Sequence, residues 1–335
     1  MSTLDLRGRP LRDLRVSLTD RCNFRCGYCM PRELFGAGHQ YLAADELLTF
    51  DEVEEVVRTA VDLGVRTVRL TGGEPLLRPG VADLVARLAA IGDLDLAMTT
   101  NGVLLRRHAA ALRAAGLDRV TVSLDGIDDA TFRRASDSPF GVSAVLDGID
   151  AAVEAGFPQV KVNAVVRRGI NEDQVVPLVE HFRGSGHVLR FIEFMDVGST
   201  NGWTGSEVVP AAEIRAAIEA RWPVEELPPT RHGEVAQRLR LRDGSAEVGL
   251  ISSMSSPFCG TCTRARLTAD GRVHTCLFSS TGTDVRGLLR GSRRRGDLHT
   301  LLRRVWGGRD DRYSEVRSAL TRRADAPVEM SYIGG

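Results

Sequence analysis

The run Cys22-Asn23-Phe24-Arg25-Cys26-Gly27-Tyr28-Cys29 follows an apolar, strand-like stretch, Leu14–Leu18. Its three thiolates can hold one metal centre, because soft sulfur ligands suit iron–sulfur clusters and zinc. A closed zinc site or an electron-transfer cubane uses four protein ligands, whereas this run offers three. A cubane held here would therefore leave one iron open to another ligand, while a zinc knuckle would need a fourth ligand such as His39.

The composition is that of a globular chain without net charge. The 335 residues are 43% hydrophobic and 26% charged, enough for one large domain and a small one. The 44 basic and 44 acidic residues balance, which does not favour bulk binding to nucleic acid. No apolar run approaches the ~20 residues of a membrane span, and the N-terminus lacks the apolar core of a secretory signal. We expect a cytoplasmic protein that binds neither nucleic acid nor membrane.

All six cysteines belong to two triplets, Cys22/Cys26/Cys29 and Cys259/Cys262/Cys276. Thiols stay reduced in the cytoplasm, so clustered cysteines indicate metal ligands rather than disulfides. The second triplet has the spacing of a zinc ribbon, with His274 as the natural fourth ligand. Arg264 and Arg266 favour a different use, because residues two apart on a strand point to the same side. Two guanidiniums beside a metal centre form a forked reader of an anion or a purine edge.

From residue 12, β-rich stretches alternate with amphipathic helical stretches, which is typical of βα units around a parallel sheet. The expected strands are Leu14–Thr19, Thr67–Thr71, Leu94–Thr99, Arg119–Leu124, Val160–Val166 and Val188–Phe194. The expected helices are Phe50–Leu63, Val81–Ile91, Leu104–Ala115, Val142–Ala155 and Gln174–Arg183. Six strands predict either a doubly wound sheet or an incomplete (β/α) barrel, and both place site residues at the carboxyl ends of the strands.

The regular alternation of β-rich and helical stretches ends near residue 200. After a helix at Ala211–Arg221, the pairs Trp222-Pro223 and Pro228-Pro229 mark a boundary. Short β-like stretches and two arginine-rich helices follow, too little for a second barrel. The expected stretches are Ala236–Leu241, Ala246–Leu250, Arg264–Thr268 and Arg272–Cys276.

Polar and glycine-rich segments follow most of the expected barrel strands. The first is the cysteine run itself, and the second is Gly72-Gly73-Glu74-Pro75, whose glycines permit a close backbone approach. The others are Thr100-Asn101-Gly102, Asp125-Gly126 and Met195-Asp196. Because the carboxyl ends of parallel strands meet at one edge, these segments are expected to share one site.

The cysteine run, paired with the Gly72–Pro75 turn after the next strand, resembles the radical S-adenosylmethionine (SAM) superfamily. The resemblance implies a 4Fe-4S cluster whose open iron is chelated by the amino and carboxylate groups of SAM. It implies that the backbone at Gly73 binds the SAM amino group and that Tyr28 lies near the adenine. The implied ligands of this cluster are Cys22, Cys26 and Cys29.

The same resemblance selects the incomplete barrel among the two folds. It implies an α/β fold in which residues 1–225 form a (β/α)6 TIM-like partial barrel. Residues 226–335 then form a smaller C-terminal α+β domain that carries a second Fe-S cluster, binds substrate and ends in a Gly-Gly tail.

Further segments resemble one family, the GTP 3′,8-cyclases, which act first in molybdenum cofactor biosynthesis. The shared segments are Asp13–Ser17, Arg69–Pro75, Phe258–Arg266, Leu267–Gly271 and the terminal Gly334-Gly335. Together they extend over nearly the whole chain, from about Asp5 onward. Thr263 stands where the family usually has Asn, and Ala265 where it usually has a larger aliphatic residue, so contacts beside the arginines are less certain than the cluster ligands.

This resemblance implies that Cys259, Cys262 and Cys276 hold a second 4Fe-4S cluster that binds the guanine of GTP. The positions implied to contact GTP are Arg15, Arg69, Thr100, Lys161, Arg264 and Arg266, and Arg190 is a further candidate from its direction on the sixth strand. The implied SAM contacts also include Ser123 and Met195. The two arginines Arg264 and Arg266 are expected to act with the first three cysteines in catalysis.

The implied reaction cyclises GTP to (8S)-3′,8-cyclo-7,8-dihydroguanosine 5′-triphosphate. A 5′-deoxyadenosyl radical from SAM removes the ribose 3′ hydrogen, and the carbon radical attacks C8 of guanine. The resemblance implies GTP and an external electron donor as partners, and it leaves the next enzyme of the pathway and a second copy of the chain as candidate partners.

Two alternatives stay open on the sequence. One is a radical SAM enzyme that modifies a peptide or protein and carries an auxiliary Fe-S cluster. The other is a non-catalytic zinc adaptor with two structural knuckles, against which the Gly72–Pro75 motif already weighs.

Overall fold

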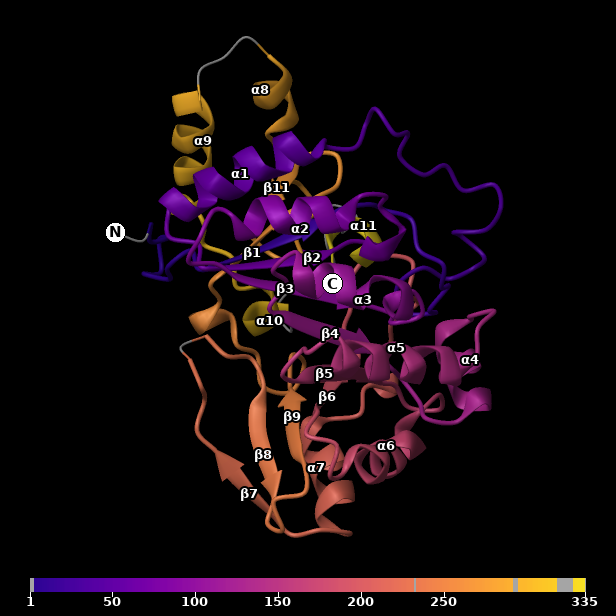
Figure 1. The fold of residues 1–335 in the computed structure, drawn as a ribbon. Coiled ribbons are helices and arrows are strands. Elements are labelled where there is room, and N and C mark those ends of the chain that lie inside the picture. The colour runs from indigo at the N-terminus through magenta and orange to yellow at the C-terminus, as the bar shows by residue number, and fades with distance from the viewer. Residues whose placement is uncertain (1–2, 232, 292–294, 318–327, 335) are drawn as a thin grey trace.

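A computed structural model describes residues 3–231, 233–291, 295–317 and 328–334. Six parallel strands form the body of the sheet in chain order (Figure 1). They are β1 (Asp13–Ser17), β2 (Thr67–Thr71), β3 (Asp95–Thr100), β4 (Arg119–Ser123), β5 (Val160–Val166) and β6 (Val188–Glu193). Neighbours pair in parallel register from β1 to β6, as βα units require.

Helices connect these strands and cover the outer face of the sheet. They are α1 (Phe50–Asp62), α2 (Val81–Ala89), α3 (Leu105–Ala114), α4 (Asp129–Ser136), α5 (Val142–Glu154), α6 (Val175–Phe182) and α7 (Ala211–Glu219), with 3-10 turns η1 (Pro75–Leu77), η2 (Glu172–Gln174) and η3 (Gly205–Glu207). The predicted elements match these bounds within one or two residues at each end. The sequence did not predict α4 or, in the C-terminal region, β7 (Val224–Leu227), because both elements are short and rich in polar side chains.

Strand β5 explains how the sheet separates core from cavity. Val160, Val162, Ala164 and Val166 are buried, whereas the residues between them are half-buried. Successive side chains on a strand point to opposite faces, so the apolar set packs against the helices. The alternate set faces the interior of the partial barrel, where Asn163 and Val165 line a cavity.

The C-terminal elements extend the same sheet at both edges. They comprise β7 (Val224–Leu227), β8 (Gln237–Leu241), β9 (Glu247–Ile251), β10 (Arg264–Leu267), β11 (Arg272–His274) and β12 (Thr283–Asp284), followed by α8 (Arg286–Arg290), α9 (Arg295–Gly307), α10 (Tyr313–Val316) and α11 (Met330–Ile333). In the described part of the chain the order is β12-β11-β10-β1-β2-β3-β4-β5-β6-β9-β8-β7. A division of the chain at residue 225 stays a prediction.

The connection between β9 and β10 links the two edges of the partial barrel. β9 pairs with β6 in parallel, and β10 pairs with β1 in parallel. The segment 252–263 between them contains the 3-10 turn η4 (Cys259–Thr261). Two of the C-terminal cysteines are therefore carried to the open side of the barrel. No helix in the described residues is long and apolar enough to cross a membrane.

Candidate active site

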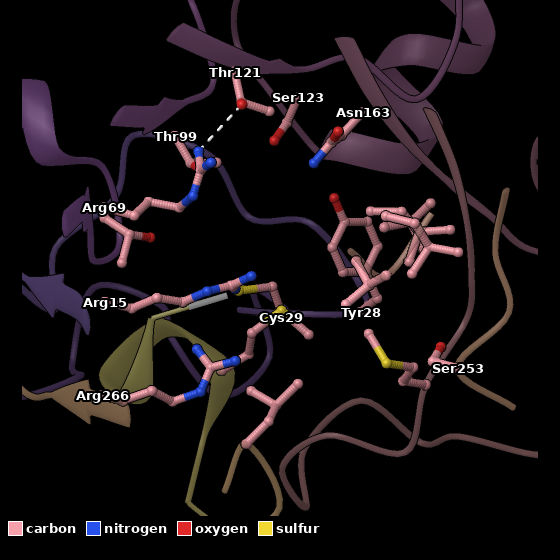
Figure 2. A pocket seen from close by; sticks show the side chains of 18 of the residues that line it. Arg15, Tyr28, Cys29, Arg69, Thr99, Thr121, Ser123, Asn163, Ser253 and Arg266 are labelled. Carbon is pink, nitrogen blue, oxygen red and sulfur yellow. Dashed lines mark hydrogen bonds between the residues drawn. The ribbon is translucent and has the colours of Figure 1, made fainter. Parts of the chain in front are cut away.

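Both cysteine triplets line one cavity of about 310 Å³ at the carboxyl ends of the barrel strands. Its walls come from the loops after β1, β2, β3 and β4 and from the connection that precedes β10. Figure 2 shows Arg15, Arg69 and Arg266 extending into it from one side and Tyr28 facing them from the other. The cysteines that line it are Cys22, Cys26, Cys29, Cys259, Cys262 and Cys276. Segments more than 200 residues apart thus meet in a single site.

The first cysteine loop is a tight turn held by its own backbone. The amides of Cys29 and Met30 both donate to the carbonyl of Cys26, at 2.9 and 2.8 Å. Burial raises the pKa of the Cys26 thiol well above its usual value, and the carboxylate of Asp125 raises it further. Burial, followed by Glu74, raises the pKa of Cys22 to about 11. A thiolate is the ligand form of cysteine, so these residues need a metal cation to hold their charge.

The Gly72–Pro75 turn packs directly against the start of the cysteine loop. A Cβ on Gly73 would lie 2.2 Å from the carbonyl oxygen of Arg21, and Gly72 has a φ of +140°. Only glycine tolerates this contact and this conformation. The glycines are therefore needed for close contact between the Gly72–Pro75 turn and the start of the cysteine loop.

Glu74 ties the ends of β2 and β3 together. Its carboxylate accepts from the Thr100 hydroxyl at 2.7 Å and from the Asn101 amide at 2.8 Å. Burial raises the pKa of Glu74 to about 7 in spite of these hydrogen bonds. Thr100 lines the cavity, but its hydroxyl donates to Glu74 and accepts from the Gly102 amide. Contact between Thr100 and GTP stays a prediction.

Tyr28, Ser123 and Met195 line the cavity beside the first triplet. The hydroxyl of Tyr28 donates to Asp125 at 2.9 Å, which fixes the direction of the ring. Two further polar residues, Asn163 and Ser253, were not selected from the sequence. Asn163 Oδ1 and Ser253 Oγ are buried and have no hydrogen-bond partner in the described part of the chain. Orphaned polar atoms aimed into a cavity indicate a polar ligand.

The signal that could have identified Asn163 lies in its strand. It is a polar residue at an inward position of β5, two residues after Lys161, in an otherwise apolar stretch. Ser253 lies in an irregular loop, where no periodicity gives its direction.

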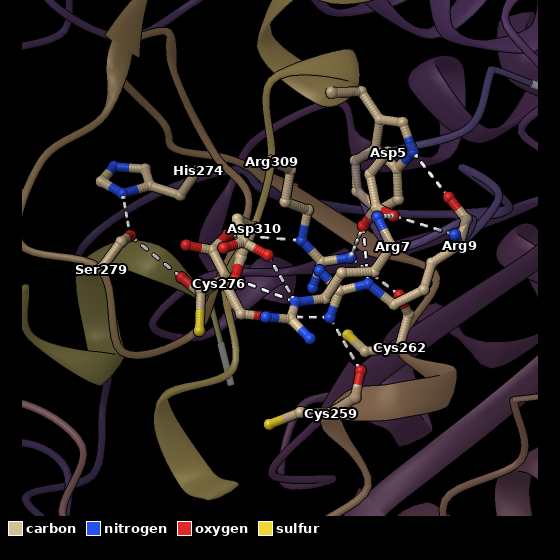
Figure 3. Close-up of polar contacts among 12 residues, drawn as sticks. Asp5, Arg7, Arg9, Cys259, Cys262, His274, Cys276, Ser279, Arg309 and Asp310 are labelled. Carbon is tan, nitrogen blue, oxygen red and sulfur yellow. Dashed lines mark hydrogen bonds and ion pairs between the residues drawn. The ribbon is translucent and has the colours of Figure 1, made fainter. Parts of the chain in front are cut away.

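The second triplet lies in cationic surroundings (Figure 3). Burial would raise the pKa of Cys262, but Arg264 and Arg309 lower it to about 6. Burial raises the pKa of Cys276 to about 11. His274, the fourth ligand of the zinc alternative, instead makes a 2.8 Å hydrogen bond between its Nδ1 and the Ser279 hydroxyl. Its ring does not line the cavity that the cysteines share.

Five buried or half-buried guanidiniums surround the cavity between the two triplets. Burial, then repulsion from Arg264, lowers the pKa of Arg15 to about 10, and burial, then repulsion from Arg119, lowers that of Arg190 to about 10. No ion pair to a carboxylate in the described residues involves Arg15, Arg69, Arg190, Arg264 or Arg266. Buried charges are normally paired, so this set requires an anionic ligand.

Lys161 lies outside the cysteine cavity, in a second cavity of about 210 Å³ that shares residues with the first. The shared residues are Arg15, Arg69, Arg190, Val235 and Arg264. Burial, followed by repulsion from Arg190, lowers the pKa of Lys161 to about 8. Arg119 and Arg231 also line this cavity and were not selected from the sequence. Because they share lining residues, the two cavities adjoin inside the partial barrel.

The C-terminal tail reaches the cavity. Met330 lines it, and the carbonyl oxygen of Gly334 accepts a hydrogen bond from Arg266. A Cβ on Gly334 would lie 2.6 Å from the Thr71 side chain, so this approach needs glycine. The last glycine of the predicted tail lies outside the described residues.

The two departures from the resembled family have local explanations. Thr263 is buried, and its hydroxyl donates to Asp13 on β1 at 2.5 Å. Ala265 is buried on the face opposite to the cavity, since its neighbours Arg264 and Arg266 face inward.

The partial barrel and its three-cysteine loop define a protein of the radical SAM class. The model of the Radical SAM superfamily matches residues 16–182, and that of Molybdenum Cofactor Synthesis C matches residues 187–315. The chain belongs to the GTP 3′,8-cyclase family.

Relatives of that name cover nearly the full length. The GTP 3′,8-cyclase of Xanthomonas axonopodis pv. citri is 55% identical over 332 residues, 99% of this chain and 98% of the relative. That of Acidothermus cellulolyticus is 51% identical over 356 residues, and that of Staphylococcus haemolyticus 47% over 335, with the same coverages.

Solved structures share the fold at low identity. Streptococcus suis SuiB bound to S-adenosylmethionine gives a TM-score of 0.63 at 17% identity, covering 94% of this chain and 69% of SuiB. SuiB bound to its precursor peptide SuiA gives 0.64 at 15%, covering 95% and 70%. This likeness supports the partial barrel that the sequence predicted.

Proposed function

We propose that this chain cyclises GTP to (8S)-3′,8-cyclo-7,8-dihydroguanosine 5′-triphosphate, the first step of molybdenum cofactor biosynthesis. The observation that carries the proposal is the set of buried and half-buried guanidiniums between the two cysteine triplets, which have no carboxylate partner in the described residues. An anionic nucleotide provides the charges that these residues need. Family membership selects GTP among such nucleotides, since the relatives bear that name.

The residues around the first triplet fit a 4Fe-4S cluster and SAM. Cys22, Cys26 and Cys29 would hold the cluster, with a fourth iron position left for SAM. The orphaned Asn163 and Ser253 provide polar partners near this end of the cavity. When bound, the cluster and SAM supply the one-electron chemistry that produces a radical on the substrate. Gly73, Tyr28, Ser123 and Met195 are the proposed SAM contacts.

The second triplet is the proposed site of a second 4Fe-4S cluster beside the guanine. Its three cysteines face the same cavity and leave one coordination position for a ligand. The fit rests on the donor set, because His274 does not line this cavity: its Nδ1 is hydrogen-bonded to Ser279 and its Nε2 lies against Gly282. Arg264 and Arg266 flank it and would orient the base and the ribose.

The second cavity suits the triphosphate. Its lining includes seven basic and three acidic side chains, an excess of four positive charges that matches a triphosphate. The basic residues are Arg15, Arg69, Arg119, Lys161, Arg190, Arg231 and Arg264. Because this cavity adjoins the first through shared arginines, GTP can extend from the second triplet into it.

The role of the protein groups in this proposal is to position the substrate and exclude water. The buried arginines hold the nucleotide at several points, and the tail held by Arg266 covers the cavity on one side. Proposed partners are an external electron donor, the next enzyme of the pathway and a second copy of the chain.

The test is anaerobic cleavage of SAM by protein reconstituted with iron and sulfide, with a strong reductant and with GTP, ATP or no nucleotide. We expect 5′-deoxyadenosine to form together with loss of GTP, and not of ATP. Cleavage that is indifferent to nucleotide would support the alternative of a peptide-modifying radical SAM enzyme; SuiB, which shares the fold, has a structure bound to a precursor peptide. No cleavage by protein that contains iron and sulfide would contradict both.

A further inference from the structure

A buried ion-pair cluster lies directly behind the second triplet (Figure 3). It consists of Asp5, Arg9 and Arg309, whose side chains are at most 3% exposed. Arg9 Nε donates to Asp5 Oδ2 at 2.6 Å, and Arg309 Nη1 lies 3.4 Å from the same oxygen. Trp306 packs against Arg309 and donates its indole N–H to the Arg9 carbonyl at 3.1 Å. The N-terminal segment and the end of α9 are thereby joined; we name Asp5, Arg9 and Arg309 the arginine clamp.

The clamp holds the backbone of the cysteine turn. Arg9 Nη1 donates to the carbonyl of Cys259 at 2.8 Å, and Arg309 Nη1 donates to the carbonyl of Cys262 at 2.8 Å. Both ends of η4 are therefore fixed by a guanidinium from a distant part of the chain. Nη2 of Arg9 is buried and has no hydrogen-bond partner in the described residues.

The clamp places two guanidiniums and one carboxylate, all at most 3% exposed, behind the second triplet. Asp311, the other acidic partner of Arg309, is 32% exposed, so solvent screens its charge more strongly. The first triplet has the opposite surroundings, with the buried carboxylates of Glu74 and Asp125 beside it. Positive charge and hydrogen bonds favour the reduced, more negative state of an iron–sulfur centre.

We propose that the arginine clamp raises the reduction potential of the iron–sulfur centre at the second triplet above that of the centre at the first triplet. The step concerned is the addition of one electron from an external reductant to the oxidised centre. The inference rests on the proposed second cluster. Arg9 and Arg309 are positioning residues in this scheme, since they act through the cysteine turn and through charge.

The test uses a chain with Cys22, Cys26 and Cys29 all changed to Ser, so that only the second centre can assemble. This background should retain about four iron atoms per chain, against about eight for the unchanged chain. Retention of no iron would remove the second cluster of the proposed function and with it this inference. With iron present, a potentiometric titration followed by electron paramagnetic resonance measures the reduction potential of the second centre, without a contribution from the first.

In this background, Arg309→Gln removes the charge and keeps an amide donor, whereas Arg309→Lys keeps the charge. We expect Arg309→Gln to lower the equilibrium constant for reduction about tenfold, ~59 mV for one electron. Arg309→Lys should stay closer to the parent. Arg7→Gln is the control, because Arg7 lies at the exposed rim of the same network and contacts no cysteine.

Asp5→Asn should change the reduction potential of the second centre in the opposite direction. This test does not depend on whether Arg309→Gln folds. Removal of the Asp5 charge leaves Arg9 and Arg309 without the carboxylate that they share, so the surroundings of the second centre become more positive. Reduction of that centre should therefore become easier. Equal shifts for Arg309→Gln and Arg309→Lys would overturn the proposal and leave the clamp a structural device. Asp5→Asn that lowers the potential, or leaves it unchanged, would overturn it as well.

Discussion

The two cysteine triplets share one cavity, yet the charged groups beside Cys26 and Cys262 have opposite sign. Burial and the carboxylate of Asp125 raise the pKa of Cys26 well above its usual value. Arg264 and Arg309 outweigh burial and lower the pKa of Cys262 to about 6. Burial raises the pKa of Cys276, in the same triplet as Cys262, to about 11, so the contrast is local to Cys262. The difference teaches that two sites with the same donor set can differ in the charges around them.

This contrast suits the proposed reaction. A cluster held by the first triplet would supply an electron to SAM, and negative charge near it would favour a strongly reducing cluster. The second lies beside the cations that would hold a nucleotide. A negatively charged substrate would pair with these cations, and buried cations without partners are unfavourable.

The largest expected effect comes from removal of one ligand at each site. Cys26→Ser should reduce SAM cleavage to background, because no cluster then binds SAM. Cys262→Ser should retain SAM cleavage with a strong reductant but lose conversion of GTP. The amounts of 5′-deoxyadenosine and of cyclised product measure the two activities separately. If Cys262→Ser cyclises GTP at the parent rate, the second site has no part in the reaction.

Replacement of Arg266 by Ala tests whether the cationic side of the comparison acts on substrate. A hydrogen bond to a charged group contributes about 1.5–3 kcal/mol, so kcat/KM for GTP should fall roughly 10- to 100-fold. Arg272→Ala is the matched control, since Arg272 lies on the adjacent strand and its side chain is 46% exposed. Equal losses in both variants would indicate a general effect on the sheet.

The strands and the candidate ligands were predictable because they follow from local patterns. Alternation along Val160–Val166 predicts both the strand and its two faces, and the structure has the strand at these bounds. The cysteine spacing likewise predicts which residues could ligate a metal. These signals lie within a few residues of sequence, so no long-range contact is needed to interpret them.

The electrostatic contrast was not predictable from the sequence. Arg309 lies 47 residues from Cys262, and Arg9 lies 250 residues from Cys259. Their meeting depends on how β10 pairs with β1 and on how the end of α9 packs. The strand that contains Lys161 was also predicted. Its place in the second cavity was not, because that cavity is lined by residues distant in sequence.

Lys161 allows a smaller, pH-dependent test of the basic side chains that line the second cavity. Burial, then Arg190, Arg119 and Arg69, lowers its pKa to about 8 in the free protein, while Glu234 opposes the shift. A bound triphosphate favours the charged amine, so the Kd for GTP should rise with pH above about 8 and level off below it. Binding measured between pH 7 and 9.5 in Lys161→Arg should lack this rise. The same rise in both proteins would assign it to another group.

The smallest expected effect concerns the anchor of the second site to the barrel. Thr263 stands between Cys262 and Arg264, and its hydroxyl donates to Asp13 on β1. Thr263→Val keeps the shape but leaves the half-buried carboxylate of Asp13 short of a donor, which should cost about 1–2 kcal/mol in the free energy of unfolding. Thr283→Val, on the edge strand β12, is the control. The corresponding shift is roughly 2–4 °C in thermal midpoint, measured by circular dichroism. Equal midpoints for Thr263→Val and the parent would mean that this hydrogen bond does not stabilise the fold.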